Sequence, residues 1–178
     1  MDVRRALSLL QGAISETTGN WADLGCGEGT FTLALAELLG PAGRVYAVDR
    51  DVQVLSKLGR RASGHANVIP VLADFSQTPD PPDLDGPLAG LLFANSLHFT
   101  AHPERILQAW MHKLRAGGQV IIVEYDRRAA NPWVPYPIAP ARLETVAAEA
   151  GLTQPRVTAR EPSTFSGDLY VAAMTRPH

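Results

Sequence analysis

Residues 21–30 have the residue types and the spacing of a ligand-binding loop. They read Trp-Ala-Asp-Leu-Gly-Cys-Gly-Glu-Gly-Thr, so glycines stand at the alternate positions Gly25, Gly27 and Gly29. A short apolar run precedes the glycines and an amphipathic segment follows them, which predicts a strand, a loop and a helix. Glycine tolerates positive φ and carries no Cβ, so such a loop can bring backbone N–H groups close to a ligand.

The spacing of these glycines excludes two common phosphate-binding motifs. A dinucleotide fingerprint requires a glycine at position 30, where the chain has Thr30. A P-loop requires Gly-Lys-Ser/Thr, and this stretch contains no lysine. The remaining pattern, Asp-x-Gly-x-Gly-x-Gly, begins at Asp23 and resembles the first motif of the class I S-adenosylmethionine-dependent methyltransferases. An ordinary glycine-rich turn between a strand and a helix is the alternative for this stretch by itself.

Strands and helices are expected to alternate along the chain. Strands are expected at about residues 20–24, 43–49, 67–72, 88–95, 119–125, 154–160 and 166–175, and helices at 3–14, 30–39, 51–61, 103–115 and 141–150. Pro70 cannot donate to a strand ladder, which places its strand at an edge of the sheet. The proline-rich segments 76–87 and 126–140 are expected to be loops. The connection between the last two strands is too short for a parallel crossover, which predicts an antiparallel hairpin.

This order predicts an α/β fold with a doubly wound, mostly parallel sheet and helices on both faces. The resemblance covers nearly the whole chain and implies seven strands in the order 3-2-1-4-5-7-6, with strand 7 antiparallel. A helix often stands in that fold where this chain has the loop 76–87. We expect one domain over residues 1–178, with an N-terminal helix or lid at 1–19 and a cofactor-binding core at 20–125. A substrate-side loop, the last helix and the hairpin follow at 126–178.

The composition is that of a globular domain of ordinary polarity. Of the 178 residues, 46% are hydrophobic and 19% are charged. No apolar run approaches the ~20 residues of a membrane span, and the first residues do not resemble a signal peptide. The net charge of −2 disfavours nucleic-acid binding, and a single cysteine fits a reducing compartment. We therefore expect a cytoplasmic protein with no membrane and no nucleic-acid partner.

The first five predicted strands end in polar or acidic residues, at the edge where an open α/β sheet binds its ligands. The relevant segments are 23–29, 49, 74–75, 95–99 and 124–126. Packing alone does not account for five strand ends of this kind. The Asp49 carboxylate can accept hydrogen bonds from both hydroxyls of a ribose. The alternative for Asp49 is to cap the following helix, a role for which Asp51 competes.

The resemblance implies S-adenosylmethionine as the cofactor and S-adenosylhomocysteine as its product. Asp74 would accept from the adenine amino group, and the Phe75 N–H would reach a ring nitrogen. Asp23 would hold the loop and contact the methionine amino group, directly or through a water molecule. Asn95 would offer its backbone carbonyl to the methionine ammonium. Members of the family carry a small residue at the position of Cys26, and no histidine is its neighbour in sequence, so we do not expect a catalytic thiol.

Arg50 would lie either against the adenine or in solvent. The expected cofactor-binding residues are Asp23, Gly25, Cys26, Gly27, Gly29, Asp49, Arg50, Asp74, Phe75, Asn95 and Ser96.

The motif after the fourth strand, Asn-Ser-Leu-His from Asn95 to His98, bears on the acceptor. Methyltransferases that act on exocyclic amines of bases, or on glutamine, resemble one another in carrying Asn/Asp-Pro-Pro-Tyr/Phe there, which this chain lacks. The metal-dependent catechol type needs an aspartate at the end of strand four and an Asp-Asn pair after strand five. Asn95 and residues 124–126 do not match, so we expect no metal.

His98 follows the end of the fourth strand, and histidine is a usable base near neutral pH. It is a candidate for acceptor binding or proton removal, with Phe99, Tyr125 and Tyr136 as further candidates for the acceptor pocket. The alternative is that His98 packs at the start of the helix 103–115 or caps it, as His102 could.

The leading hypothesis is a methyltransferase for a small-molecule acceptor, by in-line displacement. The alternative is a module that binds S-adenosylmethionine without turnover and acts through a protein partner. The motifs name no particular acceptor and no oligomeric state.

Overall fold

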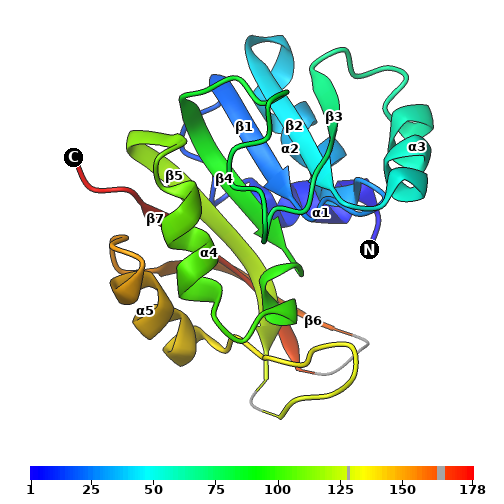
Figure 1. Ribbon diagram of the computed structural model, residues 1–178. Coiled ribbons are helices and arrows are strands. Elements are labelled where there is room, and N and C mark those ends of the chain that lie inside the picture. The colour runs from blue at the N-terminus through cyan, green and yellow to red at the C-terminus, as the bar shows by residue number, and fades with distance from the viewer. Residues whose placement is uncertain (128, 164–166) are drawn as a thin grey trace.

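The computed structural model describes residues 1–127, 129–163 and 167–178, in which seven strands form one sheet in the order β3-β2-β1-β4-β5-β7-β6 (Figure 1). The strands are β1 (Gly19–Leu24), β2 (Gly43–Asp49), β3 (Val68–Leu72), β4 (Leu88–Ala94), β5 (Leu114–Asp126), β6 (Arg156–Pro162) and β7 (Asp168–Thr175). All neighbours from β3 to β5 pair in parallel, and β7 is antiparallel to β5 and β6. The predicted fold class, strand order, edge position of β3 and C-terminal hairpin are confirmed. Residue 166, the predicted start of the last strand, lies outside the described residues.

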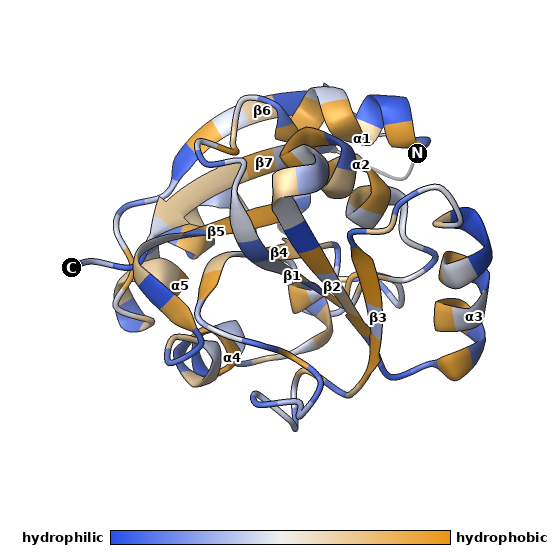
Figure 2. Cartoon of the chain, turned by 90° about the horizontal axis from the view of Figure 1, so that it is seen from above, coloured by the Kyte–Doolittle hydropathy of each residue, from blue (hydrophilic) through white to orange (hydrophobic). Residues whose placement is uncertain are grey.

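Helices cover both faces of this sheet. They are α1 (Val3–Leu10), α2 (Thr30–Leu39), α3 (Val52–Arg61), α4 (Pro103–Trp110) and α5 (Pro140–Glu149), with the short 3-10 helices η1 (Gly40–Ala42) and η2 (Leu97–Phe99). Figure 2 shows α1 and α2 on one side of the strands and α4 and α5 on the other, with apolar strands between them. Val45 of β2 packs in the cluster that contains α1 and α2, and Ala47 packs in the cluster that contains α3. Side chains two residues apart on a strand point to the same face, so α3 lies on the same face of the sheet as α1 and α2. No helix in the described part of the chain is long and apolar enough to cross a membrane.

Trp21 explains why β1 forms despite its weak strand composition. Its side chain is fully buried in the core on the α1–α2 face. It is paired in register with Gly90 of β4, and a Cβ on Gly90 would lie 2.3 Å from the indole ring. The large side chain on β1 thus fits against a strand neighbour with none, and its burial offsets the poor propensity of the segment.

Two predicted helices are shorter than the sequence pattern indicates. The first ends at Leu10, two residues before Gly12. The fourth ends at Trp110, and Leu114, expected on this helix, instead begins β5 opposite Leu88. The backbone N–H of Leu88 donates to the carbonyl of Lys113 at 2.7 Å. Pairing with β4 therefore replaces helical hydrogen bonds here. The prediction that the helix extends to residue 115, which rested on the four-residue spacing of apolar residues, is wrong.

The segment 76–87 contains no helix or strand in the structure, as predicted. Leu84 is buried in the core on the α4–α5 face, which ties the middle of this loop to the domain. Lys113 also forms an ion pair with Asp80. The loop therefore has its own anchors, although no helix stands there.

Candidate functional site

A cavity of about 860 Å³ lies at the carboxyl ends of β1 to β4. Nine of the eleven expected cofactor-binding residues line it: Gly25, Cys26, Gly27, Asp49, Arg50, Asp74, Phe75, Asn95 and Ser96. They come from four different strand ends and the loops that follow them. Parallel pairing brings these ends to one edge of the sheet, so segments about 70 residues apart in sequence meet at one cavity.

The three loop glycines have positive φ, but their surroundings differ. A Cβ on Gly25 would lie 2.6 Å from the Cβ of Ser96, so Gly25 allows the segment after β4 to approach. A Cβ on Gly29 would lie 2.1 Å from Leu58 Cδ1, which is fully buried on α3. A Cβ on Gly27 would meet no atom within 4 Å. Gly27 is thus the glycine whose missing side chain leaves cavity space open.

Asp49 joins this loop to the end of β2. Its Oδ2 accepts from the backbone N–H of Gly27 at 3.0 Å, and its Oδ1 accepts from the N–H of Asp51 at 3.0 Å. The cap of α3 is Asp51, which accepts from the N–H groups of Gln53 and Val54. Asp49 is therefore not the helix cap. Each carboxylate oxygen has a second lone pair, so the group can accept from a ligand as well.

Asp74 and Phe75 form the wall beyond β3. Asp74 Oδ1 accepts from both the hydroxyl (2.6 Å) and the N–H (3.0 Å) of Ser76, and the hydroxyl bond is the main reason that the pKa of Asp74 is lowered. Arg50 Nη1 lies 3.5 Å from Asp74 Oδ2 at the exposed rim. The carbonyl of Phe75 accepts from Trp110 Nε1 at 2.9 Å, which fixes this wall to α4.

Asp23 lies behind the glycine loop and does not line the cavity in the described structure. It is fully buried, and its Oδ2 accepts from the Thr32 hydroxyl at 2.6 Å, which links β1 to the first turn of α2. Its Oδ1 has no hydrogen-bond partner among the described residues. Burial raises the pKa of Asp23 to about 7, although the Thr32 bond opposes the shift. The expected role of holding the loop fits this position, and Thr32 is a partner that the motif did not indicate.

Cys26 lines the cavity but has the environment of an inert thiol. Only 8% of the residue is exposed, and burial raises the pKa of the thiol far above its usual value. The nearby Asp23 and Asp49 raise it further. Because the thiolate is the nucleophilic form, this environment disfavours a nucleophilic role for Cys26, which stays a prediction.

The chain turns sharply after β4 at Asn95. This residue has φ of 56°, a left-handed conformation that asparagine tolerates better than most residues. Its N–H donates to the carbonyl of Val123 at 2.9 Å, so β5 holds the turn. Asn95 Oδ1 and Ser96 Oγ are buried and have no hydrogen-bond partner in the part of the chain that the structure describes. Two polar atoms at the cavity are thus available to a ligand.

His98 is not among the residues that line this cavity. Its Nδ1 lies 2.7 Å from Oε2 of the fully buried Glu124, and its backbone N–H donates to Glu124 Oε1 at 3.2 Å. The structure therefore places His98 in a buried pair that joins η2 to β5. Its role as a base stays a prediction. Sequence reasoning missed Glu124 as the partner; the available signal was an acid directly after the apolar run 120–123.

The other acceptor-pocket candidates are separated. Phe99 lines the cavity and is 63% exposed. Tyr125 lies 6.3 Å from His98 between ring centroids, but it lines a different, smaller cavity. Tyr136 is exposed, and its backbone N–H donates to the carbonyl of His98 at 3.0 Å. The structure thus brings only Phe99 of these three to the main cavity.

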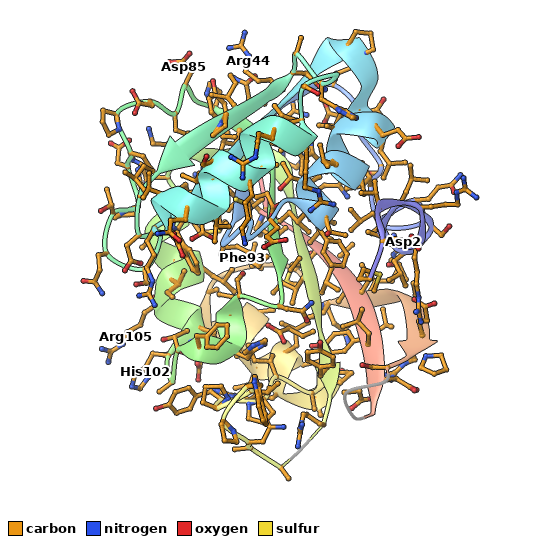
Figure 3. All side chains as sticks on the ribbon, turned by 90° about the vertical axis from the view of Figure 1, so that its right-hand side faces the viewer. Asp2, Arg44, Asp85, Phe93, His102 and Arg105 are labelled. Atoms are coloured by element: carbon orange, nitrogen blue, oxygen red, sulfur yellow. The ribbon has the colours of Figure 1, made fainter. Side chains whose placement is uncertain are left out.

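The start of α4 adds cavity residues that no motif indicated: Thr100, His102, Arg105 and Ile106. Figure 3 shows His102 next to Arg105, well away from Arg44 and Asp85 at the top of the view. His102 is the residue before α4, and Arg105 lies in its first turn. Sequence reasoning considered His102 only as a possible cap.

The profile of a family described as a methyltransferase domain matches residues 22–118. An uncharacterized 37.1 kDa protein in a transposon of Streptomyces fradiae is 30% identical over 120 residues, covering 67% of this chain and 34% of that protein. A ubiquinone/menaquinone biosynthesis C-methyltransferase of Pseudomonas aeruginosa is 28% identical over 115 residues, covering 61% of this chain and 43% of that protein. The matches thus span less than half of the length of these curated relatives.

Solved structures share the fold at low sequence identity. A SAM-dependent methyltransferase from Aquifex aeolicus has a TM-score of 0.73 at 17% identity, covering 98% of this chain and 89% of its own. The [4+2]-cyclase SpnF has a TM-score of 0.75 at 14% identity, covering 98% of this chain and 80% of its own. Because one fold serves both activities, the chemistry must be argued from the site.

Proposed function

The chain belongs to the methyltransferase domain family, and from that premise we propose that it is an S-adenosylmethionine-dependent methyltransferase for a small-molecule acceptor. One observation carries the proposal. Gly27 and Asp49 line the same strand-end cavity, the Gly27 N–H donates to the Asp49 carboxylate at 3.0 Å, and a Cβ on Gly27 would meet open space. An ordinary strand-to-helix turn has no need of this combination, since Asp51 already caps the helix.

The lining residues fit this cofactor. Asp49 has lone pairs for the ribose hydroxyls, and Asp74, kept ionised by Ser76, can accept from the adenine amino group. The backbone carbonyl of Asn95 and the unpartnered Ser96 Oγ can accept from the ammonium at the methionine end. A buried acceptor without a donor costs roughly 1–3 kcal/mol, which a bound donor relieves. When bound, S-adenosylmethionine supplies a methyl group that its sulfonium already activates.

The protein's own contribution is then positioning and the exclusion of water. The missing Cβ of Gly25 lets Ser96 approach the glycine loop, and Trp110 holds the wall at Phe75. A base is needed only if the acceptor must lose a proton. His98 is the candidate base, and its pairing with Glu124 would hold one ring nitrogen in a fixed orientation.

Calorimetry tests the cofactor site directly. S-adenosylhomocysteine and S-adenosylmethionine should bind to the full chain with micromolar affinity, and NAD should show no comparable binding because the glycine spacing lacks the third glycine of the dinucleotide fingerprint. Turnover is then measured as formation of S-adenosylhomocysteine with a panel of small phenols, amines and thiols. Absence of cofactor binding in the folded parent protein would disprove the proposal.

A binding module without turnover is the second candidate function. The observation that favours it is the position of His98, which is buried beside Glu124 and lies outside the cavity lining. This candidate predicts cofactor affinity equal to that of the enzyme, together with no S-adenosylhomocysteine formed above the rate of a Gly27→Val control. Product formation with any acceptor decides in favour of the methyltransferase.

A further inference from the structure

A second, smaller cavity lies on the other side of Asn95. It measures about 80 Å³, and Asn95 lines it as well as the main cavity. Its other walls include Arg5 at the start of α1, Tyr125 at the end of β5, Glu161 and Pro162 of β6, and Leu169 of β7. A water molecule requires only about 10–15 Å³ by a comparable measure, so this space holds a group of several heavy atoms.

The Glu161 carboxylate has one oxygen engaged and one available. Arg5 Nε pairs with Glu161 Oε1, and Arg5 Nη2 donates to the carbonyl of Pro162 at 3.2 Å. Glu161 Oε2 is buried and has no hydrogen-bond partner within the described ranges. Asn95 also lines this cavity, and its Oδ1 is likewise buried without a hydrogen-bond partner among the described residues. Two residues of this small space therefore each carry an acceptor oxygen that requires a donor.

The charges favour a neutral donor over a cationic one. Arg5 already balances the charge of Glu161, so an ammonium group placed there would also approach the guanidinium. Tyr125 and Leu169 supply apolar surface beside the two oxygens. Burial and the nearby Glu124 raise the pKa of Tyr125, so its hydroxyl stays protonated.

We propose that this second cavity anchors a neutral hydroxyl on an apolar, ring-sized end of the acceptor, with Glu161 as its specificity-determining residue and Arg5 as the residue that positions Glu161. The inference rests on the proposed function, because it places the acceptor next to the cofactor across Asn95. It concerns binding of the anchoring group and assigns no transfer step to it.

The test uses three small probes on the full chain saturated with S-adenosylhomocysteine. Phenol carries the neutral donor, anisole lacks the donor, and benzylamine carries a cation. Each probe is titrated while backbone amide resonances are followed by NMR. Phenol should shift the resonances of Tyr125, Glu161 and Leu169, and anisole should bind roughly five- to tenfold more weakly, as expected for one lost hydrogen bond. Benzylamine should bind more weakly than phenol.

Two variants locate the effect. In Glu161→Gln the amide oxygen stays with Arg5 and the NH₂ group faces the cavity, so an acceptor becomes a donor and phenol binding should fall by a similar factor. The matched control is Glu144→Gln on the exposed side of α5, which should change nothing. Asn95→Gly keeps the left-handed backbone and removes Oδ1, so it should also weaken phenol binding. Glu161→Gln should bind S-adenosylhomocysteine as the parent does.

Several results would overturn the inference: resonance shifts elsewhere, equal affinity for phenol and anisole, tighter binding of benzylamine, or unchanged phenol binding in Glu161→Gln. Failure of the proposed function is a separate result, since it appears as loss of S-adenosylhomocysteine binding by the parent. In that case the phenol titration on the cofactor-free chain still tests the second cavity by itself.

Discussion

Gly27 donates its backbone N–H to Asp49 Oδ2 over 3.0 Å, which joins the loop after β1 to the end of β2. Asp51, two residues after Asp49, accepts hydrogen bonds from the free N–H groups at the start of α3. Two neighbouring aspartates thus have separate tasks: one faces the cavity with the glycine loop, and the other starts a helix. The separation makes each of them a control for the other.

Asp49→Ala should weaken S-adenosylhomocysteine binding about ten- to a hundredfold, if the hydrogen bonds from the ribose to this carboxylate together contribute ~1.5–3 kcal/mol. Asp51→Ala should leave this affinity unchanged and lower the free energy of unfolding by about 1 kcal/mol through the lost cap. Calorimetry and urea denaturation on both variants check the pair of results. Unchanged affinity in Asp49→Ala would remove Asp49 from the site.

Gly27→Val should abolish cofactor binding while the domain stays folded. The new side chain would point into open cavity space, and the positive φ adds local strain of roughly 1–2 kcal/mol. Gly29→Val should instead destabilise the fold, because its side chain would displace the buried Leu58. Circular dichroism during heating, together with calorimetry, separates the two outcomes. Normal binding by Gly27→Val would mean that the loop is an ordinary turn.

Asp23 should make stability depend on pH. Its pKa is raised from 3.8 to about 7 in the folded protein, so between these values the folded state holds a proton that the unfolded state has lost. The contribution to stability is therefore fully present below pH 3.8, falls as pH rises, and stays lost above about pH 7. Between pH 5 and pH 8 the loss should be on the order of 3 kcal/mol.

Asp23→Asn removes this dependence, so its unfolding free energy should change less than that of the parent between pH 5 and pH 8. Urea denaturation at several pH values measures both. Thr32→Val gives a second comparison: without the hydroxyl that lowers the pKa of Asp23, the fall should extend to higher pH. Parallel pH curves for the parent and Asp23→Asn would contradict the assignment.

His98→Ala should lower the free energy of unfolding by at least ~2 kcal/mol. The change leaves Glu124 Oε2 buried without the imidazole that faces it at 2.7 Å. Cofactor affinity should not change, since His98 does not line the main cavity in the described structure. If His98 is also the base, turnover with a known acceptor falls at least ~100-fold. A variant as stable as the parent would show that the pair is not a structural link.

The sequence by itself predicted nine of the residues that line the main cavity, although it missed those at the start of α4. Local sequence pattern locates the end of a strand where a glycine loop or an acidic residue follows it. Parallel strands then bring their carboxyl ends to one edge of the sheet. Gly25, Gly27, Asp49 and Asp74 are therefore found where the pattern predicted them. The strand order could be predicted only from the family resemblance, because local periodicity shows where strands form but not which strands pair.

The tertiary structure decided where side chains point once the chain leaves a strand. His98 turns toward Glu124, 26 residues away in sequence, because a buried polar group needs a partner and β5 supplies one. Leu114 joins a strand because β4 offers hydrogen bonds that its spacing could not indicate. The meeting of Arg5 and Glu161 depends on the docking of α1 beside β6, across 156 residues. Such contacts follow from packing between distant segments, so no local pattern contains them.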